Sequence, residues 1–259
     1  MSIIETEITR AIVERFYSRF LDNVASDVAI VGAGPSGLTA AWKIAERGLK
    51  TVVFERGLKP GGGLTGGGMM FSEIVIQADA LTIINELGVN FVEQRPGYFV
   101  ADALELLGAL LVKVARSGVK IFNLMSVEDL LLVDRKVSGL VINWSAVELA
   151  HLHVDPLTIA AKAVVDATGH AAELVHHLVR KAKVTLPTPS GNIEGEGPMW
   201  AERAEQLTVE NTREIYPGLW VAGMAANAVL GGPRMGPIFG GMLLSGQKVA
   251  ELIASKLKQ

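Results

Sequence analysis

Large apolar residues recur at every fourth position among charged residues near the start of the chain. The residues that form this pattern are Ile8, Ile12, Phe16 and Phe20. Such spacing places their side chains on one face of a helix, so the sequence predicts an amphipathic helix over about residues 6–20. We expect this helix to pack on the rest of the domain or on a neighbouring subunit.

A βαβ unit follows this helix in the sequence. Residues 27–31 are a short run, mostly apolar, typical of a buried strand. A glycine-rich turn leads into a helix that ends at about Arg47, and a second strand covers residues 51–55. The helix is short enough for a parallel crossover, which predicts the first two strands of a parallel α/β sheet.

The rest of the chain alternates further helices and strands with glycine-rich segments. Helices are predicted over residues 77–89, 102–117, 171–181 and 241–257, and strands over 119–133, 137–144, 164–169 and 219–223. Loops are predicted at 61–68, 185–198 and 231–241, where glycine or proline is frequent. No internal repeat or linker interrupts this pattern, so we expect a single domain over residues 1–259.

Composition narrows the class of function. The chain has 259 residues, of which 49% are hydrophobic and 20% are charged, enough for a full core. Its formal net charge is −3 and no run of Lys or Arg exceeds a pair, so nucleic acid is not an expected partner. We find no signal peptide at the start, and no apolar run reaches the roughly 18–20 residues of a membrane span. We therefore expect a cytoplasmic protein that does not enter membranes.

The chain contains no cysteine. This absence excludes a disulfide, a thiolate metal ligand and a cysteine nucleophile. Any sulfur chemistry must therefore take its sulfur from outside the chain.

A nucleotide-binding motif lies between the first strand and the helix that follows it. Gly32, Gly34 and Gly37 form a Gly-x-Gly-x-x-Gly pattern, and this strand–turn–helix context makes the motif specific. The first glycine makes the tight turn, the second lets a pyrophosphate approach the backbone, and the third lets the helix pack on the strand. The helix N-terminus then offers free N–H groups to the phosphates. We expect an adenine dinucleotide to bind here.

Glu55 lies 18 residues after Gly37, at the end of the second strand. Its carboxylate is placed to accept hydrogen bonds from a ribose diol, whereas a 2′-phosphate would be repelled. The motif does not separate NAD from FAD. Flavin-dependent oxidoreductases with two dinucleotide-binding folds usually have an Asp after the glycine of the late strand, but here Gly223 is followed by Met224. The missing carboxylate argues against FAD.

The five histidines are concentrated between residues 151 and 177. His176 and His177 lie in a predicted helix with a polar face, where solvated surface residues are the ordinary interpretation. Alternation in an extended segment would place His151, His153 and Asp155 on one side. His170 follows the end of a strand, where side chains of α/β folds point toward the ligand crevice. An imidazole and a carboxylate on different loops could bind a divalent metal or could be hydrogen-bonded structural residues.

Several motifs in this order resemble the Thi4 family of thiamine thiazole synthases over roughly residues 10–255. They are Gly32–Gly37, Glu55-Arg56, the 61–68 loop with Met69-Met70-Phe71, Val127-Glu128-Asp129-Leu130, Asn143-Trp144, His153-Val154-Asp155-Pro156, Thr168-Gly169-His170 and Arg234-Met235-Gly236-Pro237-x-Phe239-Gly240. The resemblance implies a Rossmann-like α/β fold of the flavoprotein type with two dinucleotide-binding folds. In that fold a central parallel sheet with helices is accompanied by a smaller β-sheet.

The resemblance also implies a reaction. NAD is consumed as a substrate: nicotinamide leaves, the ADP-ribose condenses with glycine, sulfur is added, and ring closure gives an ADP-linked thiazole carboxylate. By resemblance, the residues that line the NAD pocket are Ser36, Glu55, Arg56, Gly63, Val127 and Met224. Asp155 and His170 resemble the family's iron(II) ligands, and Arg234 resembles the residue that grips the glycine carboxylate. A family octamer with shared sites implies that the two iron ligands can come from different subunits.

One departure from the family pattern concerns sulfur. Eukaryotic members carry a cysteine immediately before the x-Asp-Pro unit and donate its sulfur once, whereas this chain has His153 there. It therefore resembles the members that use free sulfide and turn over repeatedly. His153 could act as a general base or only fill space. A flavin-dependent oxidoreductase and a NAD-binding or metal-chaperone protein are the alternatives.

Overall fold

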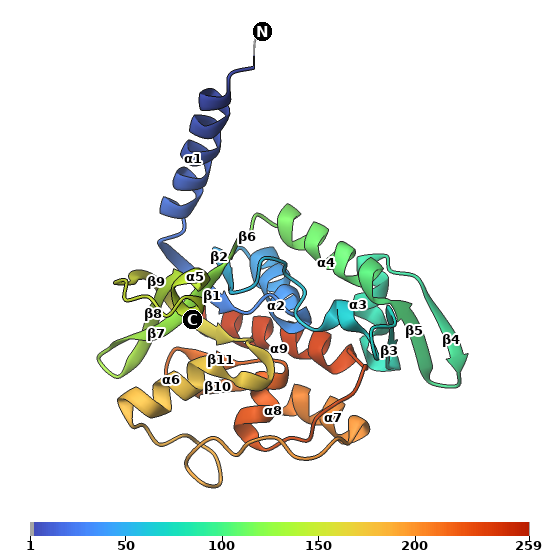
Figure 1. Ribbon diagram of the computed structural model, residues 1–259. Coiled ribbons are helices and arrows are strands. Elements are labelled where there is room, and N and C mark those ends of the chain that lie inside the picture. Colours follow the sequence, from blue (N-terminus) through green and yellow to red (C-terminus); the bar gives the residue numbers. More distant parts are fainter. Residues whose placement is uncertain (1–2, 259) are drawn as a thin grey trace.

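The computed structural model describes residues 3–258, and its larger sheet has eight strands within that range. These strands are β1 (Ala25–Val31), β2 (Thr51–Glu55), β6 (Lys120–Asn123), β7 (Met125–Val133), β8 (Lys136–Trp144), β9 (Leu157–Asp166), β10 (Arg213–Tyr216) and β11 (Leu219–Val221). Their order is β10-β11-β9-β1-β2-β6, and the β7–β8 hairpin joins this sheet through β8, which pairs with β9 (Figure 1).

The predicted βαβ unit is confirmed. β1 and β2 pair in parallel, and α2 (Pro35–Glu46) connects them. β9 pairs with the other edge of β1 and β11 with β9, both in parallel. Val31, Phe54, Asp166 and Val221 are partners across these ladders, so four parallel strands end at one edge of the sheet. Ligands of open α/β sheets bind at this carboxyl edge.

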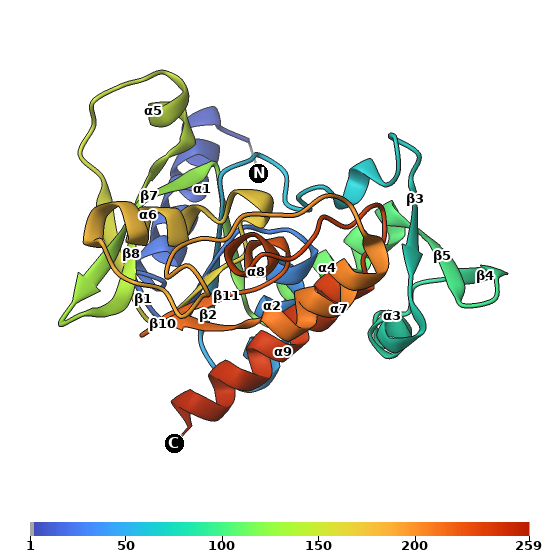
Figure 2. The same ribbon diagram turned by 90° about the horizontal axis from the view of Figure 1, so that it is seen from below.

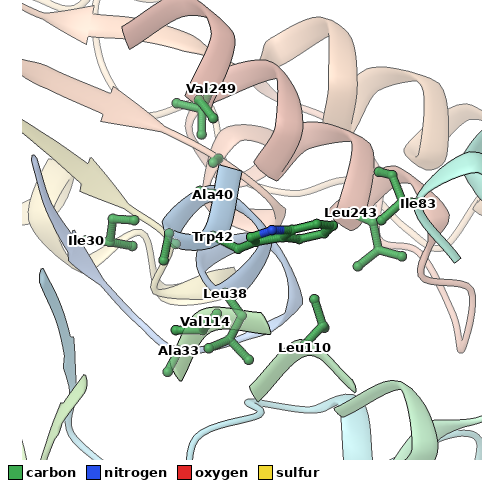
Figure 3. Packing of buried hydrophobic residues seen from close by; sticks show 14 of the residues in the cluster. Ile30, Ala33, Leu38, Ala40, Trp42, Ile83, Leu110, Val114, Leu243 and Val249 are labelled. Atoms are coloured by element: carbon green, nitrogen blue, oxygen red, sulfur yellow. The ribbon is translucent and has the colours of Figure 1, made fainter. Parts of the chain in front are cut away.

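Helices cover both faces of the parallel strands. Alternate residues of β1 face opposite sides: Val28 and Ile30 belong to one buried cluster, and Ala29 and Val31 to another. The first cluster contains residues of α2, α3 (Leu81–Leu87), α4 (Ala103–Arg116) and α9 (Gly240–Leu257). Trp42 is fully buried among them (Figure 3). The second contains residues of α6 (Glu173–Ala182) and α8 (Met224–Leu230).

A smaller antiparallel sheet accompanies the larger one, as the family resemblance implied. It consists of β3 (Glu73–Ile76), β5 (Tyr98–Asp102) and β4 (Phe91–Arg95), in the order β3-β5-β4, and it lies beside α3 (Figures 1 and 2). The fold class predicted from the sequence is thus confirmed by the two sheets. The single-domain organisation stays a prediction.

Several element boundaries were predicted wrongly. The strand predicted over 119–133 is two strands, because Leu124 has a left-handed φ of 56° that turns the chain from the parallel sheet into the β7–β8 hairpin. The helix predicted over 77–89 is a short 3-10 turn followed by α3 alone. Elements that no pattern predicted are β3, β4, β5, β10, α5 (Ser145–Leu149), α7 (Ala201–Asn211) and α8.

The N-terminal helix extends away from the rest of the chain (Figure 1). It is α1 (Glu5–Leu21), close to the predicted range, and it contains no buried residue. Phe16 and Phe20 contact the ring of Phe122, and Phe16 also stacks on Trp144. The N-terminal turns of the helix leave Ile8 and Ile12 exposed to solvent, and packing of these turns on the domain or on another subunit stays a prediction. Met1 and Ser2, part of the segment searched for a signal peptide, lie outside the described residues.

Across residues 3–258, no helix combines the length and the apolar character needed to cross a bilayer.

A buried carboxylate joins α7 to the start of α9. Glu205 is 6% exposed and accepts the N–H of Gly241 at 2.6 Å. Burial raises the pKa of Glu205 to about 6 from an ordinary value of 4.5, against the hydrogen bonds from Gly241 and Gln77, which lower it. The folded protein therefore holds a proton at pH values where the unfolded chain has already lost it.

This shift predicts a pH-dependent stability. The free energy of unfolding should fall by about 2 kcal/mol in total as the pH rises from well below 4.5 to well above 6, because ionising this group is less favourable in the folded state than in the unfolded chain. Glu205→Gln should remove this slope and stabilise the protein at neutral pH. Chemical denaturation between pH 4 and 7 measures the free energy of unfolding of the wild type and of Glu205→Gln. Glu202→Gln, which changes an exposed carboxylate of the same helix, is the control. Equal slopes in wild type and Glu205→Gln would refute the assignment.

Candidate active site

A cavity of about 620 Å³ lies at the carboxyl edge of the parallel strands. Most of the site residues predicted from the sequence line it. They are Gly32, Gly34, Ser36, Glu55, Arg56, Gly63, Val127, His170, Met224 and Arg234. Gly37, His153 and Asp155 do not line it. The structure thus brings ten of the thirteen predicted positions to one cavity, although they come from segments about 200 residues apart in the chain.

The three motif glycines have three different surroundings. Gly32 has a φ of 98°, and a Cβ there would lie 2.3 Å from the Ala167 carbonyl oxygen. A Cβ on Gly37 would lie 2.0 Å from the Gly32 carbonyl oxygen, so only glycine lets α2 pack this closely. A Cβ on Gly34 would meet nothing within 4 Å. Gly34 therefore leaves open space in the cavity at the N-terminus of α2, where a phosphate group fits.

These surroundings predict opposite effects for two substitutions. Gly34→Val should weaken NAD binding at least about tenfold, because its side chain fills the open space, while the free energy of unfolding changes by about 1 kcal/mol or less. Gly37→Ala should instead destabilise the fold by about 1–3 kcal/mol through overpacking. Calorimetric titration with NAD and chemical denaturation measure the two effects. Normal NAD affinity in Gly34→Val would show that the phosphates of NAD do not bind at this turn.

Glu55 is held in place by two backbone N–H groups. Its Oε2 accepts from Ala33 at 2.8 Å and its Oε1 accepts from Gly57 at 2.7 Å. Each carboxylate oxygen keeps a second lone pair for a hydroxyl donor. Arg56, the next residue, forms an ion pair with Glu173 from α6, which also lines the cavity. Burial raises the pKa of Glu173, while the Arg56 guanidinium lowers it.

Two serine hydroxyls in the cavity wall are buried without a hydrogen-bond partner in the described part of the chain. They belong to Ser36, in the first turn of α2, and to Ser126, in β7. Buried hydroxyls are normally hydrogen-bonded, so these two are exceptions in the wall of the cavity. The sequence did not point to Ser126, because a single serine in an apolar strand gives no signal.

The turn that carries His170 is fixed by a fully buried carboxylate. Asp166, at the end of β9, accepts from the Thr168 hydroxyl at 2.6 Å and from the backbone N–H groups of Thr168, Leu174 and Val175. Burial raises the pKa of Asp166, and these hydrogen bonds lower it. Asp166 therefore joins the end of β9 to the first turn of α6 and fixes the backbone on both sides of His170.

His170 contacts a residue that sequence reasoning missed. Its Nδ1 lies 2.8 Å from Oε1 and 2.9 Å from Oε2 of Glu196. Glu196 belongs to the segment 185–198, which is without regular structure as predicted. No motif or periodic pattern within that segment distinguishes Glu196 from its neighbours.

Asp155 and His153 lie outside the cavity that contains His170. Both are exposed in the segment before β9, and Asp155 borders an apolar groove of about 240 Å³ with Phe16, Trp144 and Val154. The predicted alternation is wrong for His151, which has a left-handed φ of 51° in the turn after α5. Within residues 3–258 no three His, Asp or Glu side chains are grouped so that they could hold a metal ion. Asp155 and His170 border different cavities of the chain.

His176 and His177 are on α6, the helix that the sequence predicted there. His176 is exposed and His177 is half-buried. Together with His151 they border a second cavity, of about 710 Å³, which shares Ser126, Val127, Ala171 and Glu173 with the first. Burial lowers the pKa of His177, and the nearby Arg180 lowers it further.

The chain matches the Thi4 family over residues 9–239. A thiamine thiazole synthase of Desulfosudis oleivorans is 53% identical over 258 residues, which cover 100% of both chains. One of Pyrococcus horikoshii is 55% identical over 254 residues, 98% of each chain. A crystal structure of Thermovibrio ammonificans THI4 superposes with a TM-score of 0.96 at 48% identity and full coverage of both chains.

These matches extend over the whole fold and the whole cavity, and they identify an enzyme of thiamine thiazole biosynthesis. They also bear out the resemblance drawn from the motifs. The chain belongs to the Thi4 family.

Proposed function

We propose that this protein converts NAD, glycine and sulfide into ADP-5-ethyl-4-methylthiazole-2-carboxylate, with release of nicotinamide and with a requirement for iron(II). The observation that carries the proposal is the cavity at the carboxyl edge of the sheet. It gathers a phosphate-binding turn, a carboxylate for a ribose, an imidazole and a guanidinium. The names of the relatives support thiazole formation as the outcome.

NAD would lie along the carboxyl edge of β1 and β2. The N-terminus of α2 and the space beside Gly34 suit the diphosphate, because free N–H groups and the helix dipole favour an anion. Glu55 suits the adenosine ribose diol, and its fixed orientation lowers the entropy cost of binding. Val127 and Met224 form part of the buried apolar wall of the cavity.

Glycine would be held by Arg234. This residue lines the same cavity, and its side chain is exposed there. Its backbone is fixed by hydrogen bonds to Gly197 and from Trp200. A planar guanidinium can bind a carboxylate through two parallel hydrogen bonds, which leaves the amino group of glycine free to react with the exposed sugar.

The donor set suits iron(II). An imidazole nitrogen and a carboxylate oxygen are both accepted by ferrous iron, and two protein ligands leave coordination positions open. His170 would supply the nitrogen, since the contact of its Nδ1 with Glu196 leaves Nε2 available. Asp155 would supply the oxygen from a second copy of the chain. When bound, the metal would hold sulfide and the glycine-derived nitrogen close together.

A homo-oligomer with shared sites, such as an octamer, is part of the proposal. Large apolar side chains are exposed in residues 144–157, which include Asp155, and along α1, as expected of a protein–protein contact. They are Trp144, Leu149, Leu152, Val154 and Leu157, with Ile8, Ile12 and Phe16 of α1. The cytoplasm, where sulfide and ferrous iron are kept reduced, is the proposed location.

Product analysis tests this function. Anaerobic incubation with NAD, glycine, iron(II) and sulfide should release nicotinamide and give a product with the mass of the ADP-linked thiazole carboxylate. Isotopically labelled glycine should enter that product. A yellow as-purified protein with a flavin spectrum would support the oxidoreductase alternative instead. Tight binding of NAD without its consumption would support a NAD-binding or metal-chaperone protein.

A further inference from the structure

The contact between His170 and Glu196 is asymmetric in its exposure. The His170 side chain is 52% exposed in the cavity wall, whereas the Glu196 side chain is 14% exposed. Both carboxylate oxygens lie within hydrogen-bond distance of the same ring nitrogen, Nδ1. A mostly buried carboxylate thus faces one nitrogen of an imidazole and leaves the other nitrogen, Nε2, out of the contact.

The backbone around Glu196 is fixed to a distant part of the chain. Gly195 donates to the Ala228 carbonyl at 3.0 Å, and Gly197 donates to the Gly232 carbonyl at 3.1 Å. Arg234 donates back to the Gly197 carbonyl at 3.1 Å. Both sequence neighbours of Glu196 are therefore held by hydrogen bonds. Since Asp166 fixes the turn on the other side, both partners of the contact are attached to rigid backbone.

The direction of the hydrogen bond follows from the chemistry of a carboxylate. Ionised Glu196 has only acceptors, so Nδ1 of His170 must carry the proton. In the neutral imidazole the lone pair then lies on Nε2, the nitrogen that a metal ion can bind. Histidines that bind metals regularly donate their other N–H to a carboxylate in this way, which fixes the tautomer and the ring orientation.

We propose that Glu196 is a positioning residue: it holds the His170 ring with its proton on Nδ1 and presents Nε2 to the metal. The inference rests on the proposed function in one respect, namely that His170 is a metal ligand. Glu196 itself touches neither the metal nor the substrates. The same short segment fixes the backbone of Arg234, so the segment 195–200 orders both the metal side and the glycine side of the cavity.

The tautomer can be measured without any metal. Sedimented protein labelled with 15N-histidine gives ring-nitrogen signals in magic-angle-spinning NMR, and the signal lost in His170→Ala identifies His170 among five histidines. At a pH well above the ordinary histidine pKa, His170 should carry its proton on Nδ1 in wild type and in Glu196→Gln, whose amide oxygen still accepts. In Glu196→Ala the preference should disappear. An Nε2–H tautomer in wild type, or no change in Glu196→Ala, would overturn the inference.

Metal affinity provides the second readout. Cobalt(II), an air-stable probe for the ferrous site, is titrated against a competing chelator. Glu196→Ala should weaken binding roughly 10–100-fold, and Glu196→Gln should recover most of the loss. Glu202→Gln, an exposed carboxylate on α7 outside the cavity, should bind as wild type does.

The outcomes separate this inference from the proposed function. If His170→Ala loses cobalt(II) and Glu196→Ala does not, the role of Glu196 is wrong while the ligand assignment stands. If His170→Ala binds cobalt(II) as tightly as wild type, the ligand assignment fails, and this inference fails with it. Unfolding midpoints and NAD affinities of all variants show whether each one has folded with an intact cavity.

Discussion

Asp155→Ala and His170→Ala should each abolish thiazole formation, and a mixture of the two variants assembled into one oligomer should regain activity. Each site of the proposed oligomer takes Asp155 from one copy and His170 from another. In a randomly mixed assembly of equal parts, about one quarter of the sites would contain both intact residues. The expected recovery is therefore about one quarter of the wild-type rate, from two inactive parents.

The structure gives a reason for this complementation. Asp155 borders an apolar groove beside α1, while His170 lines the large cavity at the carboxyl edge of the sheet. Both residues are exposed in the chain, and the contact with Glu196 is the hydrogen bond that His170→Ala removes, so each replacement should leave the fold intact.

Co-expression of two differently tagged variants, followed by two affinity steps, isolates the mixed oligomers. Asp134→Ala, an exposed carboxylate in the β7–β8 hairpin, is the matched control and should keep full activity. Iron-dependent turnover in both single variants would show that Asp155 and His170 are not the metal ligands. Inactive parents that stay inactive after mixing would place both ligands in one subunit, contrary to the proposal.

The second large effect is expected from the omission of sulfide. Because the chain has no cysteine, it holds no thiol sulfur that the product could take. With NAD, glycine, iron(II) and sulfide under anaerobic conditions, more than one thiazole should form per subunit. Without sulfide the reaction should stop before sulfur insertion and leave a glycine adduct of ADP-ribose.

Intact-protein mass spectrometry provides the control for this experiment. The mass should be the same before and after turnover, because no side chain loses sulfur to become dehydroalanine. Air should inhibit the reaction, since both ferrous iron and sulfide are oxidised. A thiazole formed without added sulfide, or a protein that becomes lighter during the reaction, would refute the sulfide requirement.

Prediction from sequence was most accurate where one element has a strong local pattern. The glycine spacing of 32–37 requires a tight turn before a helix, and the structure has that turn, with Gly32 at a positive φ and Gly37 at a close backbone contact. The strand β1, a buried apolar run, and the helix α9 were likewise predicted close to their observed ranges. Short elements were missed. The hairpin of β4 and β5 does contain a turn signal, Pro96-Gly97, that could have revealed it.

The sequence by itself determined the glycine turn at 32–37, the βαβ unit around it and the absence of thiol sulfur, because each of these depends on a short local pattern or on composition. Only the tertiary structure decided that Glu196 contacts His170, 26 residues away, and that Asp155 borders a different cavity from His170. The physical reason is that such contacts depend on backbone hydrogen bonds between distant segments, here 195–197 with 228–234. No local pattern of side chains encodes that pairing.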